Sequence, residues 1–207
     1  MEVLEAIKTR RSIRKYQTTP VDDQTVEFVL EAARWAPSWK NNQCWRFIVV
    51  RDDNVKAELA STLIDNPSTG AIRSAPVVIV ACAELGKSGY NQEKLATDKG
   101  EWFMFDVALA MQNLMLAARS KKLGTVCVGL FDAGKAASIL KVPEGSCVVA
   151  MTPLGYPDQE PKVRLRKELA EIVFYDSYGK QWGALERSGS QIELPLPESR
   201  ATDIPRS

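Results

Sequence analysis

The chain has 207 residues, of which 45% are hydrophobic and 26% are charged, a composition typical of one large globular domain. Its 27 basic and 26 acidic residues leave a net charge of +1, which disfavours a nucleic-acid-binding or membrane-surface protein. The chain contains no histidine, so Ser-His-Asp and Cys-His catalytic pairs and imidazole metal sites are excluded. An enzyme of this composition is expected to take its chemistry from a cofactor.

The cysteines and the apolar runs indicate the compartment. Cys44, Cys82, Cys127 and Cys147 are far apart and form no CxxC motif, so we expect buried free thiols and neither disulfides nor zinc. The N-terminus has no basic region followed by an apolar core, and no apolar run approaches membrane-spanning length. We therefore expect a cytoplasmic protein with no membrane partner.

The first local feature is the segment RRSIRKY at residues 10–16, which follows a short helical pattern at residues 2–8. Guanidinium groups are planar donor forks that suit phosphate oxygens, and Ser12 adds a hydroxyl donor. A solvated basic turn is the competing interpretation. A second basic cluster, KVRLRK at residues 162–167, suggests that the two clusters together form a phosphate clamp.

In the first half of the chain, Asp22 can cap a helix whose apolar stripe runs to Ala33 and ends before Pro37. The amide-rich and hydroxyl-rich loop at 37–44 comes next. It is followed by a strand at 45–50, a helix at 54–64 and an apolar strand at 75–82.

In the second half, residues 85–100 are polar and aperiodic, and we expect a mobile loop or a short broken helix. The stretch 101–121 is apolar nearly all round, which predicts a long, central and buried helix. Strands are predicted at 125–130 and 147–152, with a helix at 132–140 between them. Since sheet signals are few and the central helix is long, the pattern favours an α+β fold.

The C-terminal part is a separate case. From Ser188 the sequence is rich in Ser, Pro and Glu, and prolines 195, 197 and 205 forbid a regular helix. An extended arm across a partner subunit and a disordered tail remain equal alternatives. We expect one domain at residues 1–180 and a C-terminal extension or arm at 181–207.

Two kinds of motif can be set aside. The sequence contains neither GxGxxG nor GxxxxGK[ST], which disfavours a Rossmann site and a P-loop. The carboxylate pairs Asp22/Asp23 and Asp52/Asp53 lie at predicted helix starts, where capping explains them.

Five segments in order resemble the FMN-dependent nitroreductase family: RRSIRKY at 10–16, PSWKNNQCWRF at 37–47, DVALAMQNLMLAA at 106–118, VGLFD at 128–132 and GYPDQEPKVRLRKEL at 155–169. The resemblance covers nearly all of residues 2–179. It implies an α+β fold with a central mixed or antiparallel sheet flanked by helices. It also implies an intertwined homodimer with a C-terminal arm and two flavins at the subunit interface.

The resemblance implies a set of FMN-binding positions. They are Arg10, Arg11, Ser12, Arg14, Pro37, Ser38, Trp39, Asn41, Gln43, Val128, Gly129, Arg164 and Arg166. The N-terminal segment and the late arginine pair match the positions that hold the phosphate, and Asn41 matches an asparagine that hydrogen-bonds the flavin. Residues 37–39 match a segment that reaches the flavin from the second subunit. Residues 128–129 match a turn whose N–H groups face the N5 side.

The resemblance also implies a reaction. NAD(P)H passes a hydride to flavin N5 and leaves, and a nitroaromatic, a quinone or a similar conjugated acceptor takes its place in a ping-pong mechanism. No side chain is expected to be catalytic, and no metal is expected. Tyr90, Trp102 and Phe103, together with Trp39, are expected to form the wall of the substrate pocket.

The chain departs from the family at four positions: Cys44 replaces the usual proline, Trp39 a serine, Ala108 a glycine and Cys127 a tryptophan. Cys44 and Trp39 flank the loop that matches the cofactor-binding positions, so these two departures bear on substrate preference more than on cofactor binding. Reductive dehalogenation, enone reduction and flavin fragmentation stay open as reactions of the same fold. A non-catalytic FMN-binding or storage protein and a nucleic-acid-binding patch are the alternatives outside the enzyme class.

Overall fold

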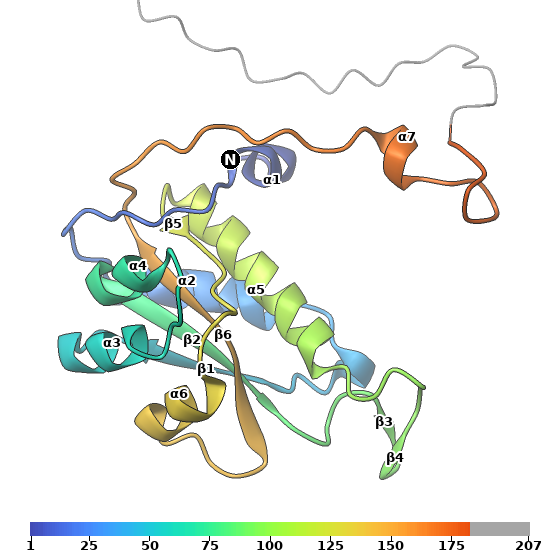
Figure 1. The fold of residues 1–207 in the computed structure, drawn as a ribbon, viewed down its shortest axis with the longest axis horizontal. Helices are drawn as coiled ribbons and strands as arrows, with labels where there is room; N and C mark the ends of the chain where they lie inside the picture. The colour runs from blue at the N-terminus through green and yellow to red at the C-terminus, as the bar shows by residue number, and fades with distance from the viewer. Residues whose placement is uncertain (183–207) are drawn as a thin grey trace, which may run out of the picture. The chain divides into compact units, whose positions relative to one another are not determined.

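The computed structural model describes residues 1–182, and the chain divides into two compact units, one of residues 1–163 and one that begins at Arg164 (Figure 1). The expected domain boundary at residue 180 remains a prediction. The expected C-terminal arm, apart from its first two residues, lies outside the described residues.

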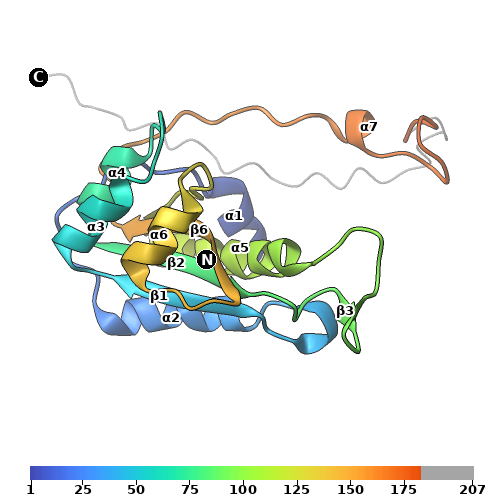
Figure 2. The same ribbon diagram turned by 60° about the horizontal axis from the view of Figure 1, so that its bottom comes forward.

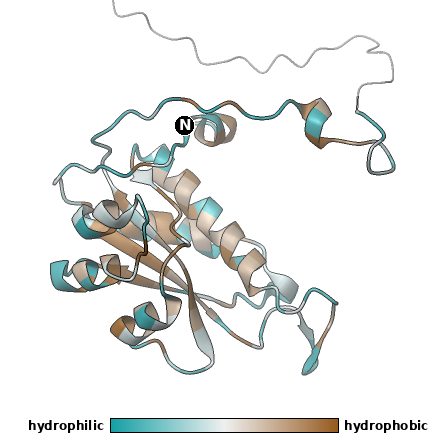
Figure 3. Cartoon of the chain, in the orientation of Figure 1, coloured by the Kyte–Doolittle hydropathy of each residue, from teal (hydrophilic) through white to brown (hydrophobic). Residues whose placement is uncertain are grey.

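A four-stranded antiparallel sheet forms the centre of the first unit. Its strands are β1 (Trp45–Val50), β2 (Val77–Glu84), β5 (Gly124–Thr125) and β6 (Ser146–Gly155), in the spatial order β1-β2-β6-β5. Successive side chains of a strand point to opposite faces, so β2 contributes Ile79 to one core cluster and Val80 to another. The sheet is therefore buried on both faces, and its strands are apolar over most of their length (Figure 3).

Helices cover both faces of the sheet. On one face lie α2 (Asp23–Arg34) and α5 (Phe103–Ser120), and on the other lie α3 (Asp53–Ala60), α4 (Thr69–Ser74) and α6 (Ala133–Leu140) (Figure 2). The short helix α1 (Val3–Thr9) contacts α5. The arrangement confirms the predicted α+β class with an antiparallel sheet flanked by helices.

Aspartates start three of these helices. The Asp22 side chain accepts a hydrogen bond from the Thr25 amide at 2.7 Å, Asp52 accepts from Asn54 and Val55, and Asp132 accepts from Lys135. Asp22 and Asp52 therefore act as the helix caps that the sequence predicts.

The predicted helix at 54–64 is partly wrong, because α3 ends at Ala60 and a separate helix, α4, follows at Thr69. The six residues of α4 include Gly70 and are too few to show an apolar period. The predicted strand at 125–130 is also too long. Only Gly124–Thr125 pair as a strand, and Val128 makes an isolated bridge to Met151.

Between residues 85 and 100, where the sequence predicts a mobile loop or a short broken helix, the structure contains a short hairpin. Its strands are β3 (Tyr90–Asn91) and β4 (Lys94–Leu95). Gly89 precedes it with φ +90°, and a Cβ there would lie 2.9 Å from the Gly100 carbonyl oxygen and from Trp102 Cδ1. This close approach requires glycine.

Helix α5 is buried on one face only, where it presents Val107, Met111 and Leu114 to the core. The opposite face carries Met104 and Phe105, which are 57% and 56% exposed in the single chain. The expectation of a fully buried helix is therefore wrong for one chain, because nothing in the described part of the chain covers this apolar face.

The basic segment is attached to the sheet beside β5. The Ile13 amide donates to the Thr125 carbonyl at 3.0 Å, and Ser12 forms a parallel bridge with Thr125. Gly124 allows this contact, since a Cβ there would lie 2.6 Å from Ile13 Cγ1.

Gly124→Ala is expected to destabilise the protein by roughly 1–3 kcal/mol, because the added methyl group overpacks against Ile13. Adding Ile13→Ala makes room, so the double variant should lose less than the sum of the two single losses in urea unfolding. Gly129→Ala, whose Cβ meets nothing within 4 Å, is the control. Strictly additive losses would contradict the packing argument.

The second unit is described up to residue 182 and contains the single turn α7 (Leu169–Ile172). The Glu168 amide donates to Glu171 Oε2 at 2.8 Å, and the rings of Tyr175 and Trp182 stack at 4.5 Å. Within residues 1–182, no helix is both long enough and apolar enough to span a bilayer.

Candidate functional site

The loop at residues 37–44, here called the cofactor loop, has an unusual backbone. Lys40, Asn41 and Gln43 have φ values of 48°, 58° and 48°, which place three non-glycine residues in the left-handed region. Each such residue costs on the order of 1–3 kcal/mol and persists only where its surroundings hold it. Clusters of this kind occur at ligand sites.

Hydrogen bonds hold the cofactor loop. The Gln43 amide donates to Ser38 Oγ at 3.0 Å, which closes the loop on itself. The Gln43 side-chain amide donates to Asn41 Oδ1 at 3.1 Å, so the two predicted flavin-contacting amides lie next to each other. Asn41 is exposed, so its side-chain NH2 group and the second lone pair of its Oδ1 can form hydrogen bonds to a ligand.

Aromatic side chains join the cofactor loop to the segment at 85–102. Trp39 Nε1 donates to the Tyr90 carbonyl at 3.0 Å, and the rings of Trp39 and Trp102 lie 5.4 Å apart. The structure thus brings together three of the four expected pocket residues. Phe103 instead packs against the core, and Phe105 contacts Trp102 edge-on at 5.4 Å.

The arginines of the basic segment have different surroundings. Arg14 Nε donates to Ser68 Oγ at 3.2 Å while the side chain stays exposed. Arg11 Nη1 donates to the Lys8 carbonyl at 2.6 Å and to the Arg10 carbonyl at 2.9 Å, so it also caps the C-terminus of α1. Ser12 is half-buried in its bridge to Thr125.

The turn at residues 128–129 lies next to this segment. Desolvation of its sulfur atom raises the pKa of Cys127, although the residue as a whole is exposed, and the nearby charge of Arg10 offsets part of this rise. The Val128 amide donates to the Met151 carbonyl at 2.8 Å, which differs from the expectation that both amides of the turn are available. Gly129 is exposed, a Cβ there would meet nothing within 4 Å, and its amide donates to no acceptor within residues 1–182.

Arg164 and Arg166 belong to the second unit. Both side chains are exposed, and Arg166 Nη1 lies 3.5 Å from the Arg164 carbonyl oxygen. The phosphate clamp made from both basic clusters remains a prediction.

The cysteines are all free, as expected, but not all are buried. Cys44 and Cys82 are buried, Cys147 is half-buried and Cys127 is exposed, because the chain leaves the sheet after the short β5. Burial, reinforced by the nearby Asp106 charge, raises the pKa of Cys44 to about 12. Burial raises the pKa of Cys82 to about 11, so neither thiol is nucleophilic at neutral pH.

Sequence reasoning missed Asp106. The residue is 1% exposed, and its carboxylate accepts hydrogen bonds from the Trp39 amide at 3.1 and 3.2 Å and from Ser88 Oγ at 2.6 Å. The available signal was a single acidic residue within an apolar helix, because a buried carboxylate has to be matched by donors.

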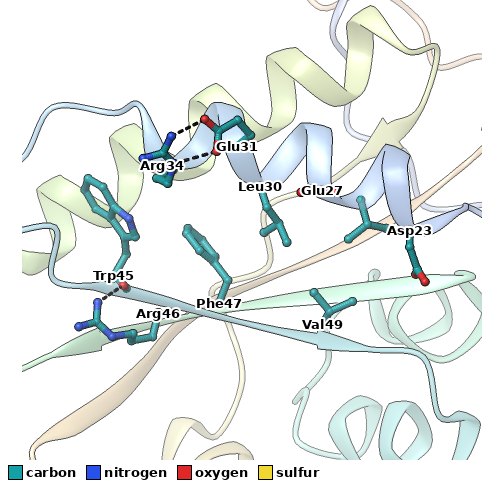
Figure 4. A pocket seen from close by; sticks show the side chains of 10 residues that line it. Asp23, Glu27, Leu30, Glu31, Arg34, Trp45, Arg46, Phe47 and Val49 are labelled. Atoms are coloured by element: carbon teal, nitrogen blue, oxygen red, sulfur yellow. Dashed lines mark hydrogen bonds and ion pairs between the residues drawn. The ribbon is translucent and has the colours of Figure 1, made fainter.

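A groove between α2 and β1 lies apart from these residues (Figure 4). Its lining contains none of the predicted site residues: it is formed by Asp23, Val26, Glu27, Leu30, Glu31, Arg34, Trp45, Arg46, Phe47 and Val49. Hydrogen bonds from Arg34 and Trp35 lower the pKa of the exposed Glu31 to about 2.

Comparison with known proteins identifies the family. The sequence matches the profile of the Nitroreductase family over residues 7–70 and 64–156. It is 35% identical over 168 residues to a protein of Methanothermobacter thermautotrophicus with the provisional name NADH dehydrogenase/NAD(P)H nitroreductase, a match that covers 79% of this chain and 82% of the relative.

Two solved structures extend the comparison. A nitroreductase family protein from Clostridium novyi NT has a TM-score of 0.70 at 34% identity over 88% of this chain and 97% of its own. The NADPH:FMN oxidoreductase of Vibrio harveyi, solved with NAD+, has a TM-score of 0.74 at 27% identity over 86% of this chain and 78% of its own. The chain belongs to the Nitroreductase family.

Proposed function

We propose that the protein is an FMN-dependent oxidoreductase that takes hydride from NAD(P)H and reduces a small conjugated acceptor such as a nitroaromatic or a quinone. The names of its relatives support the cofactor and the donor. The observation that carries the proposal is the combination of a strained, amide-bearing cofactor loop with a basic segment that lies beside an open glycine turn.

The residues present suit FMN chemically. Arg10, Ser12 and Arg14 supply the cationic and hydroxyl donors that a phosphomonoester needs, since it carries about −1.5 to −2 charges at neutral pH. Gly129 offers a backbone amide with open space around its Cα, which suits a flat ring. Asn41 and Gln43 supply amide groups for the polar edge of the ring.

The remaining predicted positions complete the proposed site. Pro37, Ser38 and Trp39 would reach the flavin from a second subunit, while Arg164 and Arg166 would add charge at the phosphate. The Val128 amide already donates to the Met151 carbonyl, so Val128 would hold the turn in place and would not donate to the flavin.

Bound FMN would supply the redox chemistry, accepting hydride at N5 from NAD(P)H and passing it to the acceptor in a separate half-reaction. The protein's own residues bind, orient and restrict access. Trp39, Tyr90 and Trp102 would border the opening in which donor and acceptor alternate. Since the two substrates share one opening, the lack of a Rossmann motif is consistent with this proposal.

A homodimer is part of the proposal. The exposed apolar face of α5, with Met104, Phe105 and Ala108, is suited to packing against a second copy of the chain. Such packing would also let the cofactor loop of one subunit complete the flavin site of the other.

The first test is the visible absorption spectrum of the purified protein, recorded before and after anaerobic addition of NADH and then of NADPH. Flavin bands that bleach on addition establish the cofactor and the donor together. Protein that stays colourless after incubation with excess FMN contradicts the proposal. Bleaching without steady NAD(P)H oxidation when quinone or nitroaromatic acceptors are added would favour an FMN-storage protein instead.

A further inference from the structure

The buried carboxylate of Asp106 stands out among the side chains that the proposed function does not use. It lies in the first turn of α5, where the helix dipole favours a negative charge. The neighbours of Asp106 along α5 are mostly apolar, and only 1% of the residue is exposed. A carboxylate in such surroundings requires several donors, and the identity of those donors indicates its role.

The donors come from both ends of the cofactor loop. The Trp39 amide donates to both carboxylate oxygens, at 3.1 and 3.2 Å, and Cys44 Sγ lies 3.7 Å from Oδ2. Trp39 precedes the left-handed residues of the loop, and Cys44 follows them. Asp106 therefore fixes the loop at the two points between which its strained backbone lies.

The same carboxylate also holds the segment at 85–102. Ser88 Oγ donates to Oδ2 at 2.6 Å, next to the contact with Cys44. Three further contacts join the two segments: Trp39 Nε1 to the Tyr90 carbonyl, Lys40 Nζ to Asn91 Oδ1 at 2.8 Å, and Asn42 Nδ2 to the Lys87 carbonyl at 2.5 Å. Of these four contacts between the two segments, only the hydrogen bond to the Asp106 carboxylate is both buried and made by a charged group.

We infer that Asp106 is a positioning residue that sets the backbone of the cofactor loop and joins it to the segment at 85–102. It acts through the Trp39 amide and Ser88 and does not touch the cofactor itself. The inference rests on the proposed function only where it concerns FMN, because the conformation of the loop can be measured without FMN.

The test compares three variants by amide hydrogen exchange of the FMN-free protein and by FMN titration. Asp106→Leu keeps the branching at Cγ but removes both acceptor oxygens, and Asp106→Asn keeps one acceptor oxygen for the Trp39 amide. Leu114→Ala is the stability control: it lies at a fully buried position of the same helix, so it lowers the free energy of unfolding without removing a hydrogen bond to the cofactor loop.

Asp106→Leu is expected to speed exchange in residues 37–44 and to raise the FMN Kd by about tenfold or more, because buried donors lose their acceptor. Asp106→Asn should recover most of both effects, and Leu114→Ala should change neither. If Asp106→Leu behaves like Leu114→Ala, with normal exchange in 37–44 and a normal Kd, the inference is wrong.

Two further outcomes are informative. If Asp106→Leu does not fold, Ser88→Ala takes its place and should speed exchange in both 85–102 and 37–44; unchanged exchange in both segments would overturn the inference. If the wild-type protein binds no FMN, the proposed function fails, while the exchange comparison still tests the positioning role.

Discussion

Replacing Arg14 with alanine is expected to weaken FMN binding by roughly tenfold to a hundredfold, the effect of losing a hydrogen bond to a charged group. The Arg14 guanidinium is exposed, and within residues 1–182 only its Nε donates a side-chain hydrogen bond, to Ser68 Oγ at 3.2 Å, so its other N–H groups can donate to a phosphate. Titration of the FMN-free protein, followed by quenching of flavin fluorescence, gives the Kd.

Lys15→Ala is the matched control, because the neighbouring side chain is exposed and its loss removes the same charge. Its Kd should stay close to that of the wild-type protein, apart from a small salt-screened change. Equal losses in the two variants would indicate diffuse attraction in place of a defined contact. An unchanged Kd in Arg14→Ala would remove Arg14 from the phosphate site.

The sequence predicts most of the architecture, because periodicity and caps are local signals. The apolar run at 75–82 and the caps at Asp22 and Asp52 correspond to real elements. The failures have tertiary causes. The stretch at 125–130 looks like a strand, but within it β6 pairs only with Thr125 and Val128. The stretch at 101–121 looks buried all round, yet one chain covers only one of its faces.

The candidate site shows the same limit. Composition and family resemblance single out Asn41 and Gln43, but no sequence rule predicts the left-handed backbone that presents them. Asp106 was missed because its significance depends on donors 18 and 67 residues away in sequence, Ser88 and Trp39. The engaged amide of Val128 likewise becomes evident only once β6 is paired beside it.

Ala108→Glu is expected to convert the proposed dimer into a monomer and to abolish tight FMN binding. Ala108 is exposed on α5, between Phe105 and Gln112 on the apolar face. In an isolated chain the new carboxylate stays in water and the fold is retained. In a dimer packed through this face the carboxylate would be buried without a partner, at an effective cost of several kcal/mol. Each flavin site would then lose the cofactor loop of the second subunit.

Light scattering coupled to size-exclusion chromatography measures the mass, and the ratio of flavin to protein absorbance measures FMN content. Circular dichroism checks that the variant is still folded. Ala133→Glu introduces the same charge at the exposed first residue of α6 and should leave both mass and FMN content unchanged. A folded Ala108→Glu variant that stays dimeric and yellow would show that this face of α5 is not the interface. A monomeric wild-type protein with full FMN content would instead show that one chain is enough to form the site.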